Sequence, residues 1–499
     1  MAAGTLTVAG QAVPEHCLVS GKMHERTSSV DGQAYAIGFE IRLPRNWNGR
    51  FLHQGNGGID GNVVAATGAF GGGPLTHALA QGFAVLSSDA GHTAAQGPAF
   101  GIDPQARLDY GYQAVGKLTP MAKGVIQATY GKGPDRSYFG GCSNGGRHAL
   151  VAASRYAADY DGILAGAPGY NLPKAAVANI FGAQRYASVA SNSADLSSAF
   201  TAAERATVAA AVLAKCDALD GATDGLVQDV EACQRSFNLQ TDVPTCSGAR
   251  DGSCLSAAQK TAIAPIFSGA VTSSGAAVYA SFPYDAGLGA GGIAFWEFTA
   301  PLALDSGAVG LIFKVPPEAA SFNGPQWALT TSIDSMVAQI NATNTVYTES
   351  AMSFMTPPDP SDLSTLKNRG GKLLIYHGVS DPIFSVNDSA AYIDRLRERG
   401  GDPSDYARLF RVPGMGHCAG GPATDQFDAL SALVAWVEQG TAPQRLTAAA
   451  RGAGNAGGVN AELPAGWSAT RTRPLCPYPK VARYAGSGSL EDAASFNCQ

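Results

Sequence analysis

Short apolar runs bounded by glycine, serine or aspartate recur along the first 170 residues of the chain. Such runs are typical of strands that are buried on both faces of a sheet. They cover residues 51–54, 83–86, 135–139 and 163–165. Helical patterns cover 108–130 and 143–156. Strands that alternate with helices predict an α/β fold, with a mainly parallel sheet between two layers of helices.

The same alternation returns near the C-terminus. Strand-like runs cover 372–376 and 407–412. The apolar positions of 427–437 line one face of an amphipathic helix, and Gly440 is its predicted end. The chain therefore carries two stretches of α/β pattern that are far apart in sequence.

Residues 171–365 between the two stretches lack this alternation and are rich in Gly, Ser and Thr. We predict one core domain, built from 1–170 and 366–499, with 171–365 inserted as a lid domain. An insertion at this point would lie over the strand ends, where sites of open α/β sheets are found. The Gly/Ala-rich segment 451–470 is predicted to be a surface loop.

Composition supports a folded protein and excludes several classes of partner. Of 499 residues, 45% are hydrophobic and 15% are charged, which suits a globular chain with a large core. The net charge of -6 gives no reason to expect nucleic acid or an anionic membrane surface as a partner. No uncharged apolar run reaches the roughly 18 residues that a membrane span requires.

Ser143 is the candidate nucleophile. Gly141-Cys142-Ser143-Asn144-Gly145 matches the pattern Gly-x-Ser-x-Gly, with a predicted strand before it and a predicted helix after it. In this motif the serine lies on a strained strand-to-helix turn, where small neighbours allow the backbone to crowd and the hydroxyl is exposed. By itself the pattern is weak in a chain with 61 glycines, so it requires partners.

A serine hydroxyl needs a base, and the base needs an orienting acid. His417 follows a predicted strand late in the chain, and Asp381 follows the preceding one. The chain order Ser143, Asp381, His417 is that of an α/β-hydrolase. His377 and Asp388 are weaker alternatives, because His377 lies only four residues before the acid and Asp388 falls in a predicted helix.

Two backbone amides are predicted to stabilise the oxyanion of the reaction. One is the amide of Asn144, directly after the nucleophile. The other comes from the glycine-rich loop 54–61, which follows the strand at 51–54, and Gly58 is the candidate within it.

The nine cysteines favour an oxidised, exported protein. None forms a Cys-x-x-Cys pair, and four lie between 216 and 254. Cys142 precedes the nucleophile and Cys418 follows the base, so a working triad would bring the two within disulfide distance. Met1–Gly4 shows no signal peptide, and we expect a secreted or periplasmic protein whose signal peptide is absent from this sequence.

Several segments together resemble the tannase and feruloyl esterase family of α/β-hydrolases. They are the Cys-Ser and His-Cys pairs, FLHQGNGG at 51–58, GIDPQAR at 101–107, GAPGYNLP at 166–173 and RTRPLCPYP at 471–479. The resemblance covers nearly the whole chain and is strongest to the branch that includes a mono(2-hydroxyethyl) terephthalate hydrolase. It implies an α/β-hydrolase core with a large lid, several disulfides, a structural calcium ion, no organic cofactor, and esters of aromatic acids as small-molecule substrates.

The segment 216–226, CDALDGATDGL, resembles the calcium loop of that family. Three carboxylates on a short loop repel one another unless a cation joins them, and calcium prefers oxygen ligands. The loop is not an EF-hand, because the twelfth position is Gln228. The implied ligands are the side chains of Asp217, Asp220 and Asp224 and the carbonyls of Ala222 and Leu226.

The resemblance also implies disulfides. The implied pairs are Cys142–Cys418, Cys216–Cys233, Cys246–Cys254 and Cys476–Cys498. Cys17 is then left without a partner within the chain.

The acid half of the substrate is less well determined. A terephthalate monoester carries a carboxylate that calls for a cationic partner, yet Lys314 is the only basic residue between Lys260 and Lys367. We therefore place hydroxycinnamate or related aromatic-acid esters first and terephthalate monoesters second. Trp296 and Phe298 are the candidate substrate contacts in the lid. An acyltransferase and a non-catalytic binding protein on the same fold remain alternatives.

Overall fold

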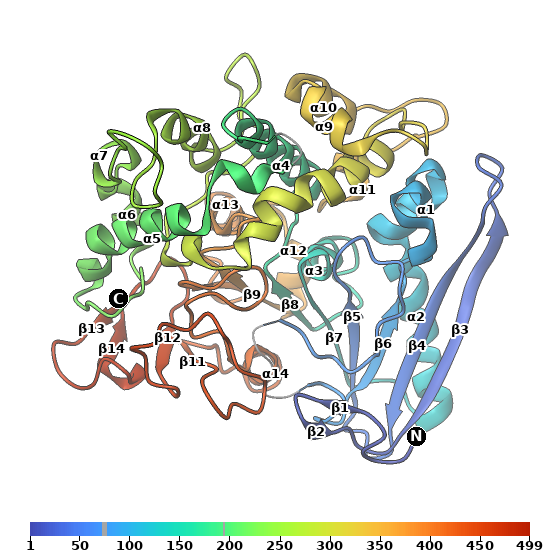
Figure 1. Ribbon diagram of the computed structural model, residues 1–499. Coiled ribbons are helices and arrows are strands. Elements are labelled where there is room, and N and C mark those ends of the chain that lie inside the picture. The colour runs from blue at the N-terminus through green and yellow to red at the C-terminus, as the bar shows by residue number, and fades with distance from the viewer. Residues whose placement is uncertain (72–76, 193–194) are drawn as a thin grey trace.

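An eight-stranded sheet forms the centre of the computed structural model, which describes residues 1–71, 77–192 and 195–499. The strand order is β10-β9-β8-β7-β5-β6-β4-β3 (Figure 1). The strands are β3 (His16–Thr27), β4 (Ala34–Pro44), β5 (Arg50–Gly55), β6 (Ala84–Ser88), β7 (Arg136–Cys142), β8 (Gly162–Gly166), β9 (Lys372–Gly378) and β10 (Ala407–Val412). From β10 to β6 the neighbours are parallel. The predicted α/β fold with a mainly parallel sheet is therefore confirmed.

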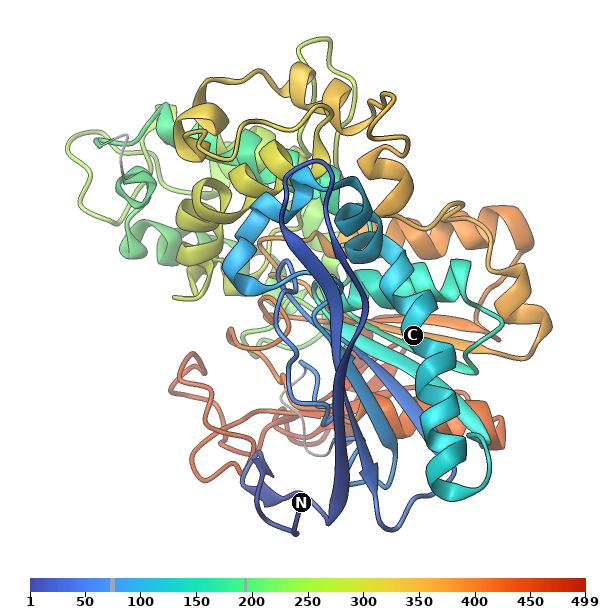
Figure 2. The ribbon, with the colours of Figure 1, turned by 90° about the vertical axis from the view of Figure 1, so that its right-hand side faces the viewer.

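The six strands predicted from sequence make up this parallel part of the sheet. Every residue of β6, β8 and β10 is buried, which explains why these segments are apolar runs rather than alternating patterns. The sequence pattern did not reveal β3 and β4, an antiparallel hairpin on the edge of the sheet. Figure 2 shows this hairpin extending beyond the sheet. Most residues of β3 are exposed, so it lacks the apolar signal of a buried strand.

Helices cover both faces of the sheet (Figures 1 and 2). In the predicted core they are η1 (Ala94–Ile102), α1 (Pro104–Leu108), the π-helix η2 (Asp109–Gln113), α2 (Ala114–Tyr130), α3 (Asn144–Arg155), α13 (Val386–Gly400), α14 (Ala429–Gln439) and η9 (Ala493–Ser495). Helix α14 ends at Gly440, which has a left-handed φ of 68°. Gly440 is therefore the helix end that the sequence predicted.

Residues 171–365, here called the lid segment, contribute no named strand among their described residues. Figure 1 shows their helices gathered beyond one end of the sheet. They are α4 (Leu172–Ala187), η3 (Leu196–Ala199), α5 (Ala202–Cys216), η4 (Asp217–Asp220), α6 (Val230–Ser236), α7 (Leu239–Asp242), α8 (Ala257–Ser268), η5 (Ala286–Gly289), η6 (Phe295–Thr299), η7 (Pro301–Asp305), η8 (Ala308–Phe313), α9 (Gly324–Thr330), α10 (Ile333–Ile340) and α11 (Ala351–Phe354). Helix α12 (Ser364–Asn368) crosses the predicted boundary and contacts α3. The run η6, η7 and η8 is π-helical, a rare conformation that is frequent at functional sites.

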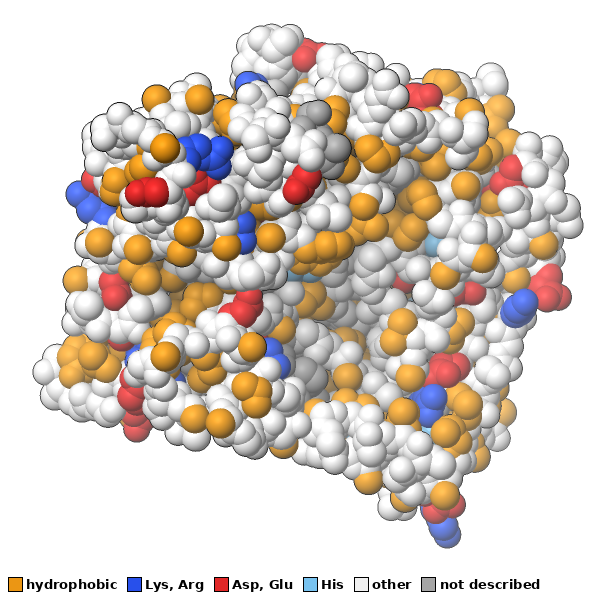
Figure 3. Space-filling view, in the orientation of Figure 1, with side chains coloured by type: hydrophobic (Ala, Val, Ile, Leu, Met, Phe, Trp, Pro, Cys, Tyr) orange, Lys and Arg blue, Asp and Glu red, His pale blue; other side chains and the backbone are white. Residues whose placement is uncertain are grey.

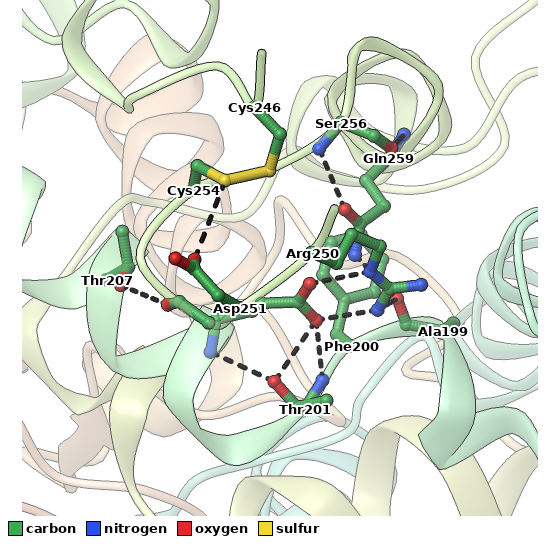
Figure 4. A network of polar contacts seen from close by, with 12 residues as sticks. Ala199, Phe200, Thr201, Thr207, Cys246, Arg250, Asp251, Cys254, Ser256 and Gln259 are labelled. Carbon is green, nitrogen blue, oxygen red and sulfur yellow. Dashed lines mark hydrogen bonds and ion pairs between the residues drawn. A yellow bond between two sulfur atoms is a disulfide. The ribbon is translucent and has the colours of Figure 1, made fainter. Parts of the chain in front are cut away.

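An ion pair and a disulfide fix part of the lid segment (Figure 4). Arg250 donates to both oxygens of the Glu204 carboxylate at 2.7 Å. Glu204 also accepts from the amide of Thr201, which caps α5. The disulfide Cys246–Cys254 closes the loop from which Arg250 extends. These contacts tie an irregular loop to a helix end that would otherwise leave its amides unpaired.

Among the described residues, three small two-stranded sheets lie outside the central sheet. They are built from β1 (Thr7–Val8) with β2 (Gln11–Ala12), β11 (Leu446–Ala449) with β12 (Thr472–Leu475), and β13 (Ala482–Tyr484) with β14 (Phe496–Cys498). The segment 451–470 contains no helix or strand, as predicted. In the part of the chain that the structure describes, no helix combines the length and apolar character needed to cross a bilayer.

Candidate active site

Ser143 occupies the sharp turn between β7 and α3. Its φ of 65° and ψ of -126° lie outside the regions that non-glycine residues normally adopt. The turn is held by two backbone bonds, from the Ser143 amide to the carbonyl of Gly166 and from the Arg147 amide to the carbonyl of Ser143, both 3.0 Å. The sequence motif thus folds into the strained strand-to-helix turn that it predicts.

Close backbone contacts explain the glycines on both sides of Ser143. A Cβ atom placed on Gly141 would lie 2.5 Å from the carbonyl oxygen of Gly55, and one on Gly145 would lie 2.3 Å from the same atom. Gly55 is the last residue of β5, so both glycines allow the turn to pack against that strand end. Larger residues at either position would push the turn away from β5.

A chain of hydrogen bonds joins the three candidate triad residues. His417 Nε2 lies 2.8 Å from Ser143 Oγ, and His417 Nδ1 lies 2.7 Å from Asp381 Oδ2. Asp381 follows β9 and His417 follows β10, which are neighbouring parallel strands. The carboxyl ends of parallel strands meet at one edge of the sheet, so residues far apart in sequence converge there.

Asp381 is held as an ionised acceptor. Its Oδ1 accepts from the amides of Ile383 at 3.0 Å and Phe384 at 3.1 Å. Burial by itself would raise the pKa of Asp381, but His417 and His377 outweigh burial, and this pKa is lowered below its ordinary value. His377 Nε2 lies 3.3 Å from Asp381 Oδ2, so it helps to stabilise the ionised carboxylate.

Asp388, the alternative acid considered from the sequence, and His148 both lie elsewhere. Asp388 is on α13, where its carboxylate accepts from Asn171 Nδ2 at 3.0 and 3.2 Å. His148, in the helix after Ser143, is buried and has its Nε2 2.9 Å from Asp60 Oδ2. Neither side chain joins the hydrogen-bonded chain at Ser143.

A disulfide connects the turn at Ser143 to the loop that carries His417. Cys142 and Cys418 are bonded, with a Cα–Cα distance of 6.1 Å and a sequence separation of 276. All four disulfide pairs expected from the resemblance are present, the other three being Cys216–Cys233, Cys246–Cys254 and Cys476–Cys498. Cys17 is free and exposed.

The glycine-rich loop after β5 passes directly beside Ser143. A Cβ atom placed on Gly57 would lie 3.8 Å from Ser143 Cβ, whereas Gly58 has open space around it and a left-handed φ of 64°. Asn144 is the first residue of α3, and amides in the first turn of a helix have no carbonyl partner within it. The loop and the helix start thus lie where the predicted oxyanion donors, Gly58 and Asn144, are required. Their catalytic role stays a prediction.

A partly open cavity of about 70 Å³ lies beside His417. Its walls come from three parts of the chain: the lid segment, the loops after β9 and β10, and the segment 451–470. The lining residues are Gly287, Ala290, Gly292, Ile293, Trp296, Pro382, Gly416, His417, Ala419, Gly421 and Glu462. Figure 3 shows this face of the molecule hollowed near its centre, below the lid segment.

Aromatic rings flank His417 on two sides. The ring of Trp296 meets it edge-on at a centroid distance of 5.1 Å, and that of Phe384 at 5.4 Å. Trp296, one of the two predicted substrate contacts, also lines the cavity. Phe298 instead packs against Tyr186 inside the lid segment, with ring centroids 5.0 Å apart. The structure therefore places Trp296 next to His417, and Phe298 against Tyr186 in the wall of a second cavity that also reaches Asp381.

Two carboxylates hold the lid segment to the loops that carry the triad. Asp285 Oδ2 accepts from Ser380 Oγ at 2.6 Å and from the Gly414 amide at 2.7 Å. Glu462 accepts from the amides of Gly292 at 3.0 Å and Gly421 at 2.6 Å. Glu462 comes from the segment predicted only as a surface loop, and no motif in the sequence marks it.

Basic side chains in the lid segment do not line this cavity. Lys314, the basic residue considered as a partner for a substrate carboxylate, is buried and paired with Glu318. Arg205 lines a neighbouring cavity between the lid segment and the loop after β9, together with Phe298 and Asp381. Glu462 is the only carboxylate, and there is no Lys or Arg, among the residues that line the described cavity beside His417.

The predicted calcium loop holds its carboxylates with backbone amides. Asp217 Oδ1 accepts from the Asp224 amide at 3.0 Å, and Asp220 Oδ1 from the Ala222 amide at 2.8 Å. Asp220 Oδ2 is buried without a hydrogen-bond partner, which suits a cation ligand. Asp224 Oδ2 pairs instead with Arg473. Within the described residues, no group of three or more His, Cys, Asp or Glu is arranged to hold a metal, so calcium binding stays a prediction.

Comparison with known proteins identifies the family. A family model described as tannase and feruloyl esterase matches residues 17–499. The chain belongs to the tannase and feruloyl esterase family. Members of this family are carboxylic ester hydrolases, and so is this chain.

Individual members of the family match over nearly their whole length. The mono(2-hydroxyethyl) terephthalate hydrolase of Piscinibacter sakaiensis is 38% identical over 536 residues, which cover 99% of this chain and 87% of that protein. A probable feruloyl esterase B of Emericella nidulans is 30% identical over 493 residues, covering 93% and 84%. The crystal structure of feruloyl esterase B from Aspergillus oryzae is similar with a TM-score of 0.76 at 26% identity, covering 97% and 91%. The predicted resemblance is thereby confirmed.

Proposed function

We propose that this chain hydrolyses esters of aromatic carboxylic acids through an acyl-enzyme on Ser143. His417, oriented by Asp381, removes the proton of the Ser143 hydroxyl as Oγ attacks the ester carbonyl. The amides of Gly58 and Asn144 stabilise the oxyanion. His417 then protonates the departing alcohol, and water activated by the same imidazole releases the acid. The observation that carries the proposal is the hydrogen-bonded chain Asp381–His417–Ser143 beside a cavity flanked by Trp296.

We further propose that the preferred ester has an uncharged acid half, such as a hydroxycinnamate. Trp296 offers an aromatic wall, and the polar backbone of the cavity can bond ring hydroxyls. Glu462 supplies negative charge at the cavity, and no lysine or arginine lines it. A carboxylate on the substrate would be repelled by Glu462 without a compensating partner.

Hydrolysis of mono(2-hydroxyethyl) terephthalate is the second candidate. It is favoured by the 38% identity with the Piscinibacter sakaiensis enzyme over nearly the whole chain. The two candidates make opposite predictions about a free carboxylate on the ring.

Kinetics on a matched set of esters separates the candidates. The set is methyl ferulate, methyl gallate, mono(2-hydroxyethyl) terephthalate and the corresponding terephthalate diester, with Ser143→Ala as the inactive reference. We expect kcat/KM to be higher for the diester than for the monoester, and Ser143→Ala to abolish turnover of all four. A monoester preferred over every neutral ester would overturn the substrate ranking. Turnover that survives Ser143→Ala would overturn the serine mechanism.

We also propose that the loop 217–226 binds a structural calcium ion. Asp217, Asp220 and Asp224 would supply carboxylate oxygens, and the carbonyls of Ala222 and Leu226 would complete the coordination. The buried, unpartnered Asp220 Oδ2 supports this proposal. The ion would join carboxylates that otherwise repel one another.

Secretion or periplasmic export is the proposed localisation. Four disulfides persist in oxidising compartments and are rare in a reducing cytosol. Thiol titration of the unfolded, unreduced protein tests this: about one reactive thiol, from Cys17, is expected from protein isolated in its native compartment.

A further inference from the structure

Hydrogen bonds join the loop with Gly58 to the helix start with Asn144, and the buried carboxylate of Asp60 accepts the shortest of them. Asn144 Nδ2 also donates to the carbonyl of Asn56 in the same loop, at 3.3 Å. Asp60 Oδ2 accepts from Asn144 Nδ2 at 2.7 Å and lies 2.9 Å from His148 Nε2. The Asp60 side chain is only 2% exposed. It belongs to the loop after β5, while both of its partners are on α3.

Asp60 also shapes its own loop. Its amide donates to the carbonyl of Gly57 at 3.2 Å, and its backbone has a left-handed φ of 59°. This turn encloses Gly58, the predicted oxyanion donor. Because a Cβ on Gly57 would lie 3.8 Å from Ser143 Cβ, a shift of the turn would move the Gly58 amide relative to the nucleophile.

Asn144 is held from its other side by Arg147. Asn144 Oδ1 accepts from Arg147 Nε at 2.7 Å. Arg147 is fully buried and donates to the carbonyls of Gly111 at 2.8 Å and Tyr110 at 3.0 Å. Both carbonyls belong to the π-helix η2. The amide side chain of Asn144 thus bridges a rigid cation and the Asp60 carboxylate.

We propose that Asp60 is a positioning residue that fixes the distance between the two amides of the oxyanion hole. Its side chain links the strand-end loop, which carries the Gly58 amide, to the residue that supplies the Asn144 amide. Preorganised donors act only if they already point to where the negative charge develops. The link therefore stabilises the transition state and leaves substrate binding unchanged. The inference rests on the proposed serine mechanism.

The experiment compares Asp60→Ala, Asp60→Asn and Asp305→Ala for turnover of methyl ferulate. Asp305 is a matched control, because it is also a buried carboxylate that accepts from an asparagine amide, Asn179 Nδ2 at 3.2 Å. Active sites are counted with a fluorophosphonate, so that kcat refers to competent enzyme. We expect kcat to fall roughly tenfold to hundredfold in Asp60→Ala with KM unchanged, since small misplacements of catalytic groups have effects of that size.

Three measurements distinguish positioning from general stability. Asp60→Asn keeps an oxygen that can accept from Asn144, so its kcat should stay within about threefold of the wild type. Asn144→Ala, which keeps the backbone amide, should lose kcat to the same degree as Asp60→Ala, and the double variant should lose no more than either. Inhibition by an aryl boronic acid, whose tetrahedral adduct mimics the transition state, should weaken in parallel with kcat.

The inference is overturned if Asp60→Ala loses no more kcat per active site than Asp305→Ala, or if its loss adds fully to that of Asn144→Ala. Should Asp60→Ala fail to fold, the kcat values of Asn144→Ala and Asp60→Asn decide whether the inference holds. Ser143→Ala separates a failure of the serine mechanism from a failure of the role of Asp60. If it retains turnover, the serine mechanism fails; if it is inactive while Asp60→Ala matches the wild type, only the role of Asp60 fails.

Discussion

Removal of the Cys142–Cys418 disulfide should affect stability and turnover together. In the chain-entropy description, a cross-link stabilises a protein by restricting its unfolded state, and the effect grows with the logarithm of loop length. For a separation of 276 residues this gives about 5–6 kcal/mol, whereas for the separation of 8 residues in Cys246–Cys254 it gives about 2.5 kcal/mol. The bond beside the triad should therefore contribute about twice as much as the one in the lid segment.

The assay compares the paired alanine variants Cys142→Ala/Cys418→Ala and Cys246→Ala/Cys254→Ala. Urea unfolding gives their stabilities, and turnover of methyl ferulate gives kcat. The first variant should also lose about tenfold or more in kcat, because the disulfide holds the turn of Ser143 against the loop of His417. The second should keep the wild-type kcat. Equal losses of stability, or a wild-type kcat in the first variant, would refute this reasoning.

Three further outcomes follow from the geometry. Glu462→Gln should raise kcat/KM for a terephthalate monoester relative to its diester, and added salt should reproduce part of that gain in the wild type by screening the carboxylate; an unchanged ratio would contradict a role for the charge. If the loop 217–226 binds calcium, a chelator should lower the unfolding temperature and Asp220→Asn should remove that response, as thermal scans with and without calcium can show. Burial raises the pKa of Asp305 to about 7. The contribution of this group to stability is therefore fully present below its pKa in the unfolded chain and is lost as pH rises through about 7, at about 1.4 kcal/mol for each pH unit between the two pKa values. Urea unfolding from pH 4 to 8 should show the free energy of unfolding falling less steeply with pH in Asp305→Asn than in the wild type.

The sequence predicted the parts of the fold whose signals are local. Strands such as β8 and β10 are buried along their whole length, so they stand out as apolar runs. The turn at Ser143 carries its own glycine pattern, because any Cβ on Gly141 or Gly145 would collide with Gly55. The hairpin β3–β4 gave no such signal, since most of β3 is exposed and its side chains contact solvent rather than a core.

The residues that shape the cavity could not be predicted in this way. Glu462 contacts Gly292 and Gly421 through backbone amides, which any residue type can supply. Asp60, unlike Glu462, could have been identified from the sequence. It lies in the glycine-rich loop 54–61, two residues after the predicted oxyanion donor Gly58. Trp296 and Phe298 were both candidates as aromatic residues of the lid, but only Trp296 contacts His417. Phe298, two residues later, packs against Tyr186 instead, and the sequence does not separate the two.

Position and charge are coupled at the cavity beside His417. Glu462 gives the cavity its only carboxylate among the described lining residues and also holds Gly292 of the lid segment to Gly421 of the histidine loop. A substitution that removes the charge of Glu462 therefore also weakens that attachment. Its effect on kcat/KM for neutral esters measures the part that comes from the weakened attachment alone. Asp285 provides an internal reference, since it attaches the lid segment to Ser380 and Gly414 without lining the cavity. If Asp285→Asn alters neutral and anionic esters equally while Glu462→Gln favours the anionic ones, charge rather than lid position determines which acid the enzyme accepts.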